Sequence, residues 1–572
     1  MLIYSFFSLV IRFIEVYMTV LQIIEVGEEK CVKNHSIKEV DAIVLGAGFA
    51  GLYMLYQLRS KGLSTVVYEA GDGVGGVWYW NRYPGARCDV ESIYYNYTFS
   101  KELYEEWNWT SRFPEQEEIL SYLNYVADRF DLRNDIQFKT RVNAAHFDEE
   151  RCKWLIHLND GTQVFAKYFI TGIGCLSAAN VPNIKGLNQF KGKWYHTGHW
   201  PHEKVDFTGK RVGIIGTGSS GIQAIPVIAK EAKHLTVFQR TPQYTIPARN
   251  HTYDKGFIRS TKENFETLKH AMRNSISGTP HIQNDRSVME DSESKRQQVF
   301  EDAWAEGGFA FAMSYNDLLT NEQSNEKASE FIRSKIREVV KDPKVAEKLS
   351  PKYMYGTKRQ VLDTDYFETY NRENVLLVDV KESPIEEITE AGIKTTNDQY
   401  DLDIIIFATG YDGMTGPLFK IDIQGKDGVA LKDKWENGAS VRTYLGITTA
   451  GFPNLFMITG PESPSVLVNM PTAIEQHVEW VANCIEYMRE HNIDVIETNI
   501  QAEEEWSKHN REIANETLYV KGDSWYTGAN IAGKPRSFLI YLGGFDYYTK
   551  RCNEIAQNNY EGYTMLKLKT IS

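Results

Sequence analysis

Two segments of the chain share one pattern of hydrophobic and polar positions. The first is VDAIVLGAGFAGLYMLYQL, beginning at Val40, and the second is RVGIIGTGSSGIQAIPVIA, beginning at Arg211. Each has a short apolar run that predicts a buried strand, followed by apolar residues at helical spacing. The turn between them reads Gly-x-Gly-x-x-Gly, which lets the backbone approach a nucleotide pyrophosphate at a helix N-terminus. The pattern therefore predicts an α/β fold with two Rossmann-like dinucleotide-binding domains.

The pattern changes after the second segment. Between Asn250 and Lys352 the sequence is charged and helix-periodic, as in EKASEFIRSKIREVVKDPKVAEKL. After it, NVLLVDV and YDLDIIIFATG predict buried strands, and the C-terminal part is rich in aromatic residues and Pro/Gly loops. We expect an N-terminal extension at 1–38, a first nucleotide domain at 39–175 and 410–572, a second at 176–250 and 353–409, and a helical insertion in the second domain at 251–352. The last segment of the first domain should also supply loops to the substrate and cofactors.

The N-terminal extension is harder to interpret. Its apolar run from Leu2 to Ile11 is too short to span a bilayer, which needs about 20 residues, and Arg12 and Glu15 interrupt the apolar sequence beyond it. No basic residue precedes the run, as a secretory signal would require. We expect an extension without membrane contact, with Met18 as an alternative start. An interfacial membrane anchor is the other interpretation.

Composition and charge narrow the range of partners. The 572 residues carry a formal net charge of −13, so the chain has no overall basic field for nucleic acid or an anionic membrane. Its six cysteines are scattered and form no CxxC pair, which argues against a disulfide framework, a zinc site and dithiol chemistry. We expect a cytoplasmic protein with small-molecule partners, no metal and no obligate protein partner.

The residue that ends the strand after the first glycine turn indicates which nucleotide binds there. This residue meets the adenosine ribose and lies roughly 20 residues beyond the first glycine. After Gly46, Gly48 and Gly51, the strand STVVYEAG places Glu69 at this point. A carboxylate can accept hydrogen bonds from both ribose hydroxyls and repels a 2′-phosphate, so the first site suits FAD or NAD.

The second turn has the opposite charge at the equivalent position. After Gly216, Gly218 and Gly221, the strand LTVFQRTP brings Arg240, with Thr241 beside it. Arginine binds phosphate through charge-assisted hydrogen bonds, which predicts NADPH in the second site. A solvated surface arginine is the alternative interpretation.

Four further motifs resemble one family. FKGKWYHTGHWP, at 190–201, matches the fingerprint F-x-G-x-x-x-H-x-x-x-W-P of the Baeyer–Villiger monooxygenases at every specified position. GGVWYWNRYPGARCD at 75–89, ATGYD from 408 and SWYTGANIAGKPR from 524 are also similar to that family. The resemblance extends from about Asp41 to Phe545. The matching fingerprint positions are Phe190, Gly192, His196, Trp200 and Pro201.

The resemblance implies a chemistry as well as a fold. It implies FAD and NADPH as cofactors, O₂ as oxidant, and a ketone that is converted through a C4a-peroxyflavin into an ester or lactone, with sulfoxidation as a possible side activity. It also implies that Arg359, in KYMYGTKRQ, is the active-site cation and that Asp89 is its partner. Arginine suits this role because its pKa lies above about 12, so it does not protonate an anionic oxidant. Without the resemblance, Arg359 would be interpreted as an ordinary surface arginine.

The two turns and the resemblance together identify the residues expected at each cofactor. Those expected at FAD are Gly46, Gly48, Gly51, Glu69, Val77, Trp78, Asp89, Tyr95, Val142 and Met470. Those expected at NADP are Arg87, Thr217, Gly218, Ser219, Ser220, Gly221, Gln223, Arg240, Thr241, Lys358, Arg359 and Trp525. Lys358 would contact the NADP phosphate and Trp525 the nicotinamide end. In the substrate-side loop PESPSVLVNM, by contrast, Glu462, Val466 and Val468 are individual to this chain.

Three alternatives remain at this point. An N- or S-oxygenating flavin monooxygenase would share both nucleotide sites, although its motif does not specify the Trp-Pro ending. A flavoprotein that binds both nucleotides without oxygenating anything would not need Arg359 and Asp89. The spacing of His196, His199 and His202 could suit zinc, but no Cys or carboxylate cluster completes the site.

Overall fold

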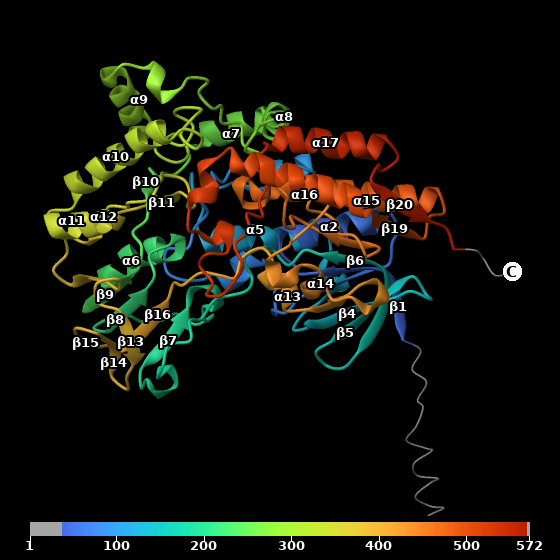
Figure 1. Ribbon diagram of the computed structural model, residues 1–572, viewed down its shortest axis with the longest axis horizontal. Helices are drawn as coiled ribbons and strands as arrows, with labels where there is room; N and C mark the ends of the chain where they lie inside the picture. Colours follow the sequence, from blue (N-terminus) through green and yellow to red (C-terminus); the bar gives the residue numbers. More distant parts are fainter. Residues whose placement is uncertain (1–36, 569–572) are drawn as a thin grey trace, which may run out of the picture.

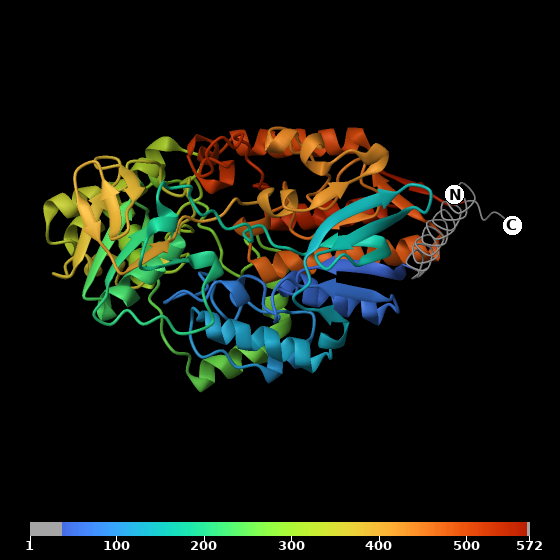
Figure 2. The ribbon, with the colours of Figure 1, turned by 90° about the horizontal axis from the view of Figure 1, so that it is seen from below.

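The computed structural model describes residues 37–568, so the predictions for the N-terminal extension lie almost wholly outside the described residues. The described chain forms two units of sheet and helices, which lie side by side along the long axis (Figures 1 and 2). None of the helices within 37–568 has the length and apolar character needed to cross a bilayer.

The first unit contains a mixed sheet with parallel strands at its centre. Strand β1 lies between β2 and β6, with Ile43 opposite Val66 on one side and Phe169 on the other. The parallel strands of this part are β1 (Lys38–Leu45), β2 (Thr65–Tyr68), β3 (Ile136–Gln137), β6 (Gln163–Thr171) and β18 (Leu455–Met457). The hairpin and edge strand beyond β6 are β4 (Val142–Asp148), β5 (Lys153–Leu158) and β17 (Asp422–Gln424). The C-terminal half thus returns to the first sheet through β17 and β18.

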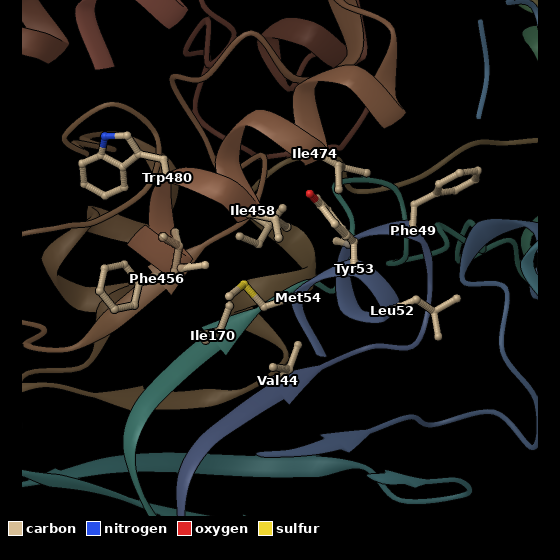
Figure 3. Packing of buried hydrophobic residues seen from close by; sticks show 14 of the residues in the cluster. Val44, Phe49, Leu52, Tyr53, Met54, Ile170, Phe456, Ile458, Ile474 and Trp480 are labelled. Carbon is tan, nitrogen blue, oxygen red and sulfur yellow. The ribbon is translucent and has the colours of Figure 1, made fainter. Parts of the chain in front are cut away.

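Helix α2 (Phe49–Ser60) is held between this sheet and helix α15 (Met470–Glu490). Figure 3 shows Met54 beside Ile170 of β6 and Tyr53 beside Ile474 of α15. Burying a side chain of this size contributes roughly 1.5–3 kcal/mol, so a helix packed on two faces is firmly fixed. The N-terminus of α2 is therefore held rigidly at the carboxyl edge of the sheet.

The second unit contains a sheet of five parallel strands in the order β12-β9-β8-β16-β7. Its strands are β7 (Lys193–His196), β8 (Arg211–Ile215), β9 (His234–Gln239), β12 (Val375–Asp379) and β16 (Ile404–Phe407). Helix α6 (Ser219–Glu231) follows the second glycine turn and packs on β8 and β9. A small antiparallel sheet follows β12 and contains β13 (Ile385–Ile388), β14 (Gly392–Thr395) and β15 (Gln399–Asp401).

The charged, helix-periodic segment contacts both units. Its helices are α7 (Lys255–Glu263), α8 (Phe265–Arg273), α9 (Glu293–Glu306), α10 (Glu322–Val339) and α11 (Pro343–Leu349). Arg273 of α8 forms ion pairs with Glu475 and Glu479 of α15, in the first unit. Phe300 of α9 and Ile332 of α10, in contrast, belong to the core of the second unit. The segment therefore passes from one unit to the other between α8 and α9.

Short elements complete the two units. Strands β10 (Thr245–Pro247) and β11 (Val361–Asp363) pair across the two ends of the helical segment. The remaining helices of the first half are α3 (Val77–Trp80), α4 (Lys101–Glu106) and α5 (Gln116–Arg129). Those of the second half are α12 (Tyr366–Thr369), α13 (Gly416–Phe419), α14 (Leu431–Lys434), α16 (Ile500–Asn515) and α17 (Phe545–Gln557). Strands β19 (Val495–Thr498) and β20 (Tyr563–Leu566) form an antiparallel pair that encloses α16 and α17 in the sequence.

Candidate functional site

The first glycine turn leaves no room for side chains. A Cβ on Gly51 would lie 1.7 Å from the carbonyl oxygen of Gly46, and a Cβ on Gly48 would lie 3.2 Å from the Cα of Gly76. Because Gly48 is the N-cap of α2 and no side chain caps this helix, backbone N–H groups at its first turn remain for a ligand. This backbone cradle fits a nucleotide pyrophosphate.

Glu69 lies beside this turn, as the sequence predicted. It is buried, and its two carboxylate oxygens each accept a hydrogen bond at 2.7 Å, from the N–H groups of Ala47 and Gly71. Burial raises the pKa of Glu69, while these hydrogen bonds oppose the rise. Each oxygen retains a lone pair, so the carboxylate can still accept bonds from ribose hydroxyls.

The other residues predicted at the first cofactor surround the same edge of the sheet. Gly76, which abuts the glycine turn, precedes Val77 and the buried Trp78, whose Nε1 donates to Tyr95 Oη at 3.1 Å. Val142 begins β4, two residues after Thr140, whose N–H donates to the Glu69 carbonyl. Met470 begins α15, next to Asn469, which bonds the Tyr94 carbonyl. The structure thus brings these predicted residues to one region.

The second glycine turn has the same close geometry and is tied to Thr241. A Cβ on Gly221 would lie 2.3 Å from the carbonyl oxygen of Gly216. Thr217 Oγ1 donates to the Thr241 carbonyl at 3.0 Å, which links the turn to the residue after Arg240. Gly218 is the N-cap of α6, and Ser219 and Ser220 form its first turn. This second cradle also fits a pyrophosphate.

A cluster of cations lies near this second cradle. Burial, together with the positive charges of Arg240 and Lys381, lowers the pKa of Lys358 to about 8. Among residues 37–568, neither Arg240 nor Lys358 forms an ion pair with a carboxylate. Lys358 Nζ instead donates to the Asp523 carbonyl and lies 5.1 Å from the centroid of the Tyr353 ring. Mutual repulsion without an anionic partner fits a phosphate-binding site.

The two units meet at Asp89 and Arg359. Asp89 is buried, and its Oδ2 accepts hydrogen bonds from Arg359 Nε at 3.3 Å and Nη2 at 3.2 Å. Arg359 Nη1 also donates to the Val466 carbonyl at 3.4 Å. Burial opposes the charge of Arg359, but attraction to Asp89 and the hydrogen bond with it, together with the neighbouring Tyr526 and Cys88, raise the Arg359 pKa. Burial raises the pKa of Asp89 and the guanidinium opposes this rise.

Helix α6 of the second unit contacts the same carboxylate. Gln223 Nε2 donates to the Arg87 carbonyl at 3.1 Å and to Asp89 Oδ1 at 3.4 Å, while its Oε1 accepts from Tyr83 Oη at 2.8 Å. Arg87 itself pairs with Glu115 at 2.7 Å. The segment that ends at Asp89 is therefore held against the helix that begins at the second glycine turn.

Trp525 lies near the same junction, in the short helical turn Trp525–Thr527. Its ring packs against Gly413, where a Cβ would lie 2.9 Å from the indole. Asn530 Nδ2 donates to the Tyr411 carbonyl at 2.7 Å, which fastens this loop to the ATGYD segment. The loop therefore covers the junction of the two units.

The fingerprint segment also joins the units. A Cβ on Gly192 would lie 2.4 Å from the Asp403 carbonyl oxygen, and Phe190 packs beside it in the second unit. Trp200 is buried, and its backbone N–H donates to the Trp80 carbonyl at 3.3 Å, in the first unit. Pro201 comes directly after it. The fingerprint thus runs from the second sheet to helix α3.

His196 of this fingerprint is buried and uncharged. Its Nδ1 accepts from the Gly198 N–H at 2.9 Å, and its Nε2 lies 3.4 Å from Thr409 Oγ1. Burial and the neighbouring His199 lower its pKa to about 4. No group of three or more His, Cys, Asp or Glu side chains within 37–568 is placed to hold a metal ion, so zinc has no ligand set there.

Sequence reasoning missed two residues of this region. Tyr526 is buried with its hydroxyl near Arg359, whose positive charge opposes the rise that burial causes in the tyrosine pKa, to about 12. Its place beside Trp525 in SWYTGAN was the available signal. Lys381 follows β12, and β12 is the neighbour of β9, which precedes Arg240. Ligands of parallel sheets bind at the carboxyl ends of the strands, and this rule could have identified Lys381.

Comparison with known proteins gives the family. A family model described as flavin-binding monooxygenase-like matches residues 38–279. A Baeyer–Villiger monooxygenase of Pseudooceanicola batsensis is 44% identical over 532 residues, 92% of this chain and 96% of that protein. A phenazine N-monooxygenase of Lysobacter antibioticus is 43% identical over 529 residues, 92% of this chain and 97% of that protein. The solved structure of an oxidised steroid monooxygenase bound to NADP has a TM-score of 0.89 at 48% identity and covers 93% of this chain and 100% of its own. The chain belongs to the Baeyer–Villiger monooxygenase family of flavin-binding monooxygenases.

Proposed function

We propose that the protein is an NADPH- and O₂-dependent flavin monooxygenase that converts ketones into esters or lactones. The observation that carries the proposal is the contact of Arg359 with the buried Asp89, at the point where the two glycine-turn units meet. Overall, a ketone, O₂, NADPH and a proton give an ester, water and NADP⁺. One oxygen atom enters the C–C bond beside the carbonyl, and the other leaves as water.

Each unit is assigned one cofactor. Residues 39–175 and 410–572 would hold FAD, through the first turn, Glu69 and the residues around Trp78 and Tyr95. Residues 176–250 and 353–409 would hold NADPH, through the second turn, Arg240 and Lys358, with the helical segment 251–352 inserted and 1–38 as an extension. When bound, NADPH supplies a hydride and FAD supplies the chemistry that activates O₂.

Arg359 is assigned the role of active-site cation. It offers a fixed positive charge where negative charge develops during oxygen transfer, and it keeps its proton because its pKa is raised. Asp89 holds the guanidinium in place, and the side chain of Arg359 stays 30% exposed, so part of it remains free to meet a ligand. The loop that carries Trp525 would exclude water from this junction, which limits wasteful release of hydrogen peroxide.

N- or S-oxygenation is the second candidate function. The phenazine N-monooxygenase is similar to this chain over nearly its whole length, so the fold alone does not decide between a carbonyl and a nitrogen. The test supplies the FAD-loaded protein with NADPH, O₂ and a panel of cyclic, aryl and linear ketones, beside a thioether and a phenazine. Ester or lactone from at least one ketone is expected. Sulfoxide or N-oxide alone, with no ester from any ketone, would overturn the proposal.

A further inference from the structure

The loop that supplies a hydrogen-bond acceptor to Arg359, residues 459–469, contains a buried carboxylate. Glu462 is 2% exposed and has a positive φ of 66°. Thr459 and Ser465 of the same loop have positive φ values of 52° and 41°. Such conformations are unfavourable for residues with a Cβ and persist only where the surroundings hold them. Contacts between this loop and the surrounding chain must therefore hold its backbone in place.

The side chain of Glu462 makes the contacts that do so. Its Oε2 accepts from the Thr443 N–H at 2.9 Å and from Ser507 Oγ of α16 at 2.7 Å. The Thr443 hydroxyl lies 3.0 Å from the same oxygen. The backbone of Glu462 is also fixed, because its N–H donates to the Leu539 carbonyl at 2.7 Å and its carbonyl accepts from Trp506 Nε1 at 3.2 Å. Glu462 thus anchors the loop to three separate segments of the chain.

This anchor lies close to Arg359 along the chain. Four residues after Glu462, the Val466 carbonyl accepts from Arg359 Nη1 at 3.4 Å, within the helical turn Ser465–Leu467. One residue after Glu462, the Ser463 carbonyl accepts from the Tyr541 N–H at 2.9 Å. The position of the anchored loop therefore sets where the acceptor for Arg359 lies.

We propose that Glu462, in its carboxylate form, is a positioning residue for Arg359 and holds the 459–469 loop so that the Val466 carbonyl meets the guanidinium. The inference rests on the proposed function, because it assigns Glu462 a part in the reaction that Arg359 supports. The role assigned to Glu462 is exerted through the loop and not by contact with the cofactors or the substrate. The family resemblance assigns no role to this position.

The charge state of Glu462 decides how well it anchors. Burial raises its pKa to about 7, against the hydrogen bonds from Ser507 and Thr443. Arg511 of α16 is the charged group whose field reaches it, while Thr443, Trp506, Ser507 and Leu539, which bond it directly, are uncharged. The Thr443 N–H and the Ser507 hydroxyl both donate to the Glu462 side chain, so these contacts favour the carboxylate over the neutral acid. The anchor should therefore weaken as the pH falls from 8 to 6.

The test compares the full-length FAD-loaded protein with its Glu462→Gln variant. Ester formed per NADPH consumed is measured at pH 6 and pH 8. For the wild type we expect a several-fold fall from pH 8 to pH 6. Glu462→Gln should match the wild type at pH 6 and change less than about twofold over the same range, since it cannot ionise. A variant that follows the wild type at both pH values would overturn the inference, whereas a wild type that forms no ester at pH 8 would overturn the proposed function.

A second pair of variants separates positioning from general stability. Ser507→Ala removes one donor and keeps the charge, so the fall in ester yield should move to higher pH by roughly half a unit to one unit. Glu503→Gln is the matched control, because Glu503 is an equally buried carboxylate of α16 that pairs with Lys434 at 2.9 Å. It should lower the melting temperature and keep the wild-type pH dependence of ester yield. Loss of that pH dependence in Glu503→Gln would contradict a specific role for Glu462.

Thermal unfolding provides a readout that needs no reaction. The folded pKa of Glu462, about 7, lies above its ordinary value of 4.5, so the folded state loses stability as the pH rises through this window. The Glu462→Gln variant has no carboxyl group to ionise at this position, so it does not lose this stability. Its melting temperature relative to the wild type should therefore rise between pH 4.5 and pH 7. A difference that stays flat across this window would show that Glu462 does not titrate there and would overturn the inference.

Discussion

Asp89 and Arg359 stand 270 positions apart in the sequence, yet Asp89 Oδ2 lies 3.2 Å from Arg359 Nη2. Asp89 ends a segment of the first unit that is bound to α6, and Arg359 precedes β11, whose Val361 and Leu362 belong to the core of the second unit. The pair therefore requires both units to be folded and docked. A charge pair at such a junction places Arg359, the proposed active-site cation, where the two cofactors would meet.

Replacing Arg359 by alanine should separate cofactor binding from oxygen transfer. We expect FAD to stay bound and NADPH still to be oxidised, while ester formation falls by at least about 10²–10³-fold, the usual cost of removing a group that stabilises developing charge. The electrons should appear as hydrogen peroxide, measured together with NADPH and ester. Arg259→Ala, at an exposed arginine of α7, is the control and should behave as the wild type. Ester formation that persists in Arg359→Ala would remove Arg359 from the mechanism.

Arg240→Ala should alter the choice of nicotinamide cofactor. A charge-assisted hydrogen bond to a phosphate is worth roughly 1.5–3 kcal/mol, or about 10–100-fold in affinity. The KM for NADPH should rise by this factor, while the KM for NADH, which lacks the phosphate, should change little. Lys233→Ala, at an exposed lysine of the same unit, is the matched control. Equal losses for both cofactors would contradict the phosphate assignment.

NADPH affinity should also depend on pH through Lys358. Its pKa is lowered to about 8, so it loses its positive charge as the pH rises through 8. Because a phosphate favours the charged form, binding of NADPH should weaken above pH 8, whereas binding of NADH should not. Titration of the FAD-loaded protein at pH 7 and pH 9 measures this. Lys358→Arg, which stays charged, should remove the difference, and an unchanged pH dependence in that variant would assign the effect elsewhere.

His477 should make the protein sensitive to acid. It is fully buried, and its Nδ1 accepts from the Thr459 N–H at 3.1 Å, so the neutral ring carries its hydrogen on Nε2, which lies 2.8 Å from Tyr548 Oη. Burial lowers its pKa from 6.5 to about 4. The unfolded state therefore binds the proton first, and stability is lost as the pH falls from 6.5 towards 4, by up to roughly 3 kcal/mol.

Denaturant unfolding of His477→Gln measures this effect. The variant is expected to be less stable at pH 7, because it loses part of the hydrogen-bond chain, but its free energy of unfolding should fall less between pH 6.5 and pH 4. His270→Gln, at an exposed histidine of α8, should keep the wild-type slope. If both variants kept that slope, another group would be responsible for the acid sensitivity.

The sequence predicted the features of the two nucleotide sites that follow from local rules. The glycines of both turns, Glu69 after the first and Arg240 after the second follow from spacing alone, because the strand-turn-helix geometry fixes where each residue lies. Asp89 and Arg359 followed only from the resemblance. No local rule relates two charged residues that far apart, and their meeting depends on how the units dock.

Other features could not be read from the sequence. The helical segment was expected within the second domain, yet α8 contacts the first unit through Arg273. The pattern of apolar and charged residues predicts the helix but does not indicate which unit it packs against. Tyr526 reaches Arg359 only through the fold of its loop. The role proposed for Glu462 depends on Thr443 and Ser507, which approach it from separate segments.

The central claim, insertion of one oxygen atom from O₂ beside a ketone carbonyl, is tested most directly with isotopically labelled gas. The FAD-loaded protein is given NADPH, ¹⁸O₂ and a ketone, and the product is analysed by mass spectrometry with fragmentation. The account predicts an ester or lactone with one heavy oxygen, placed in the new C–O–C linkage, and the Arg359→Ala variant should form at least about 10²-fold less of it. Consumption of NADPH without any labelled ester or lactone from the whole ketone panel would contradict the account.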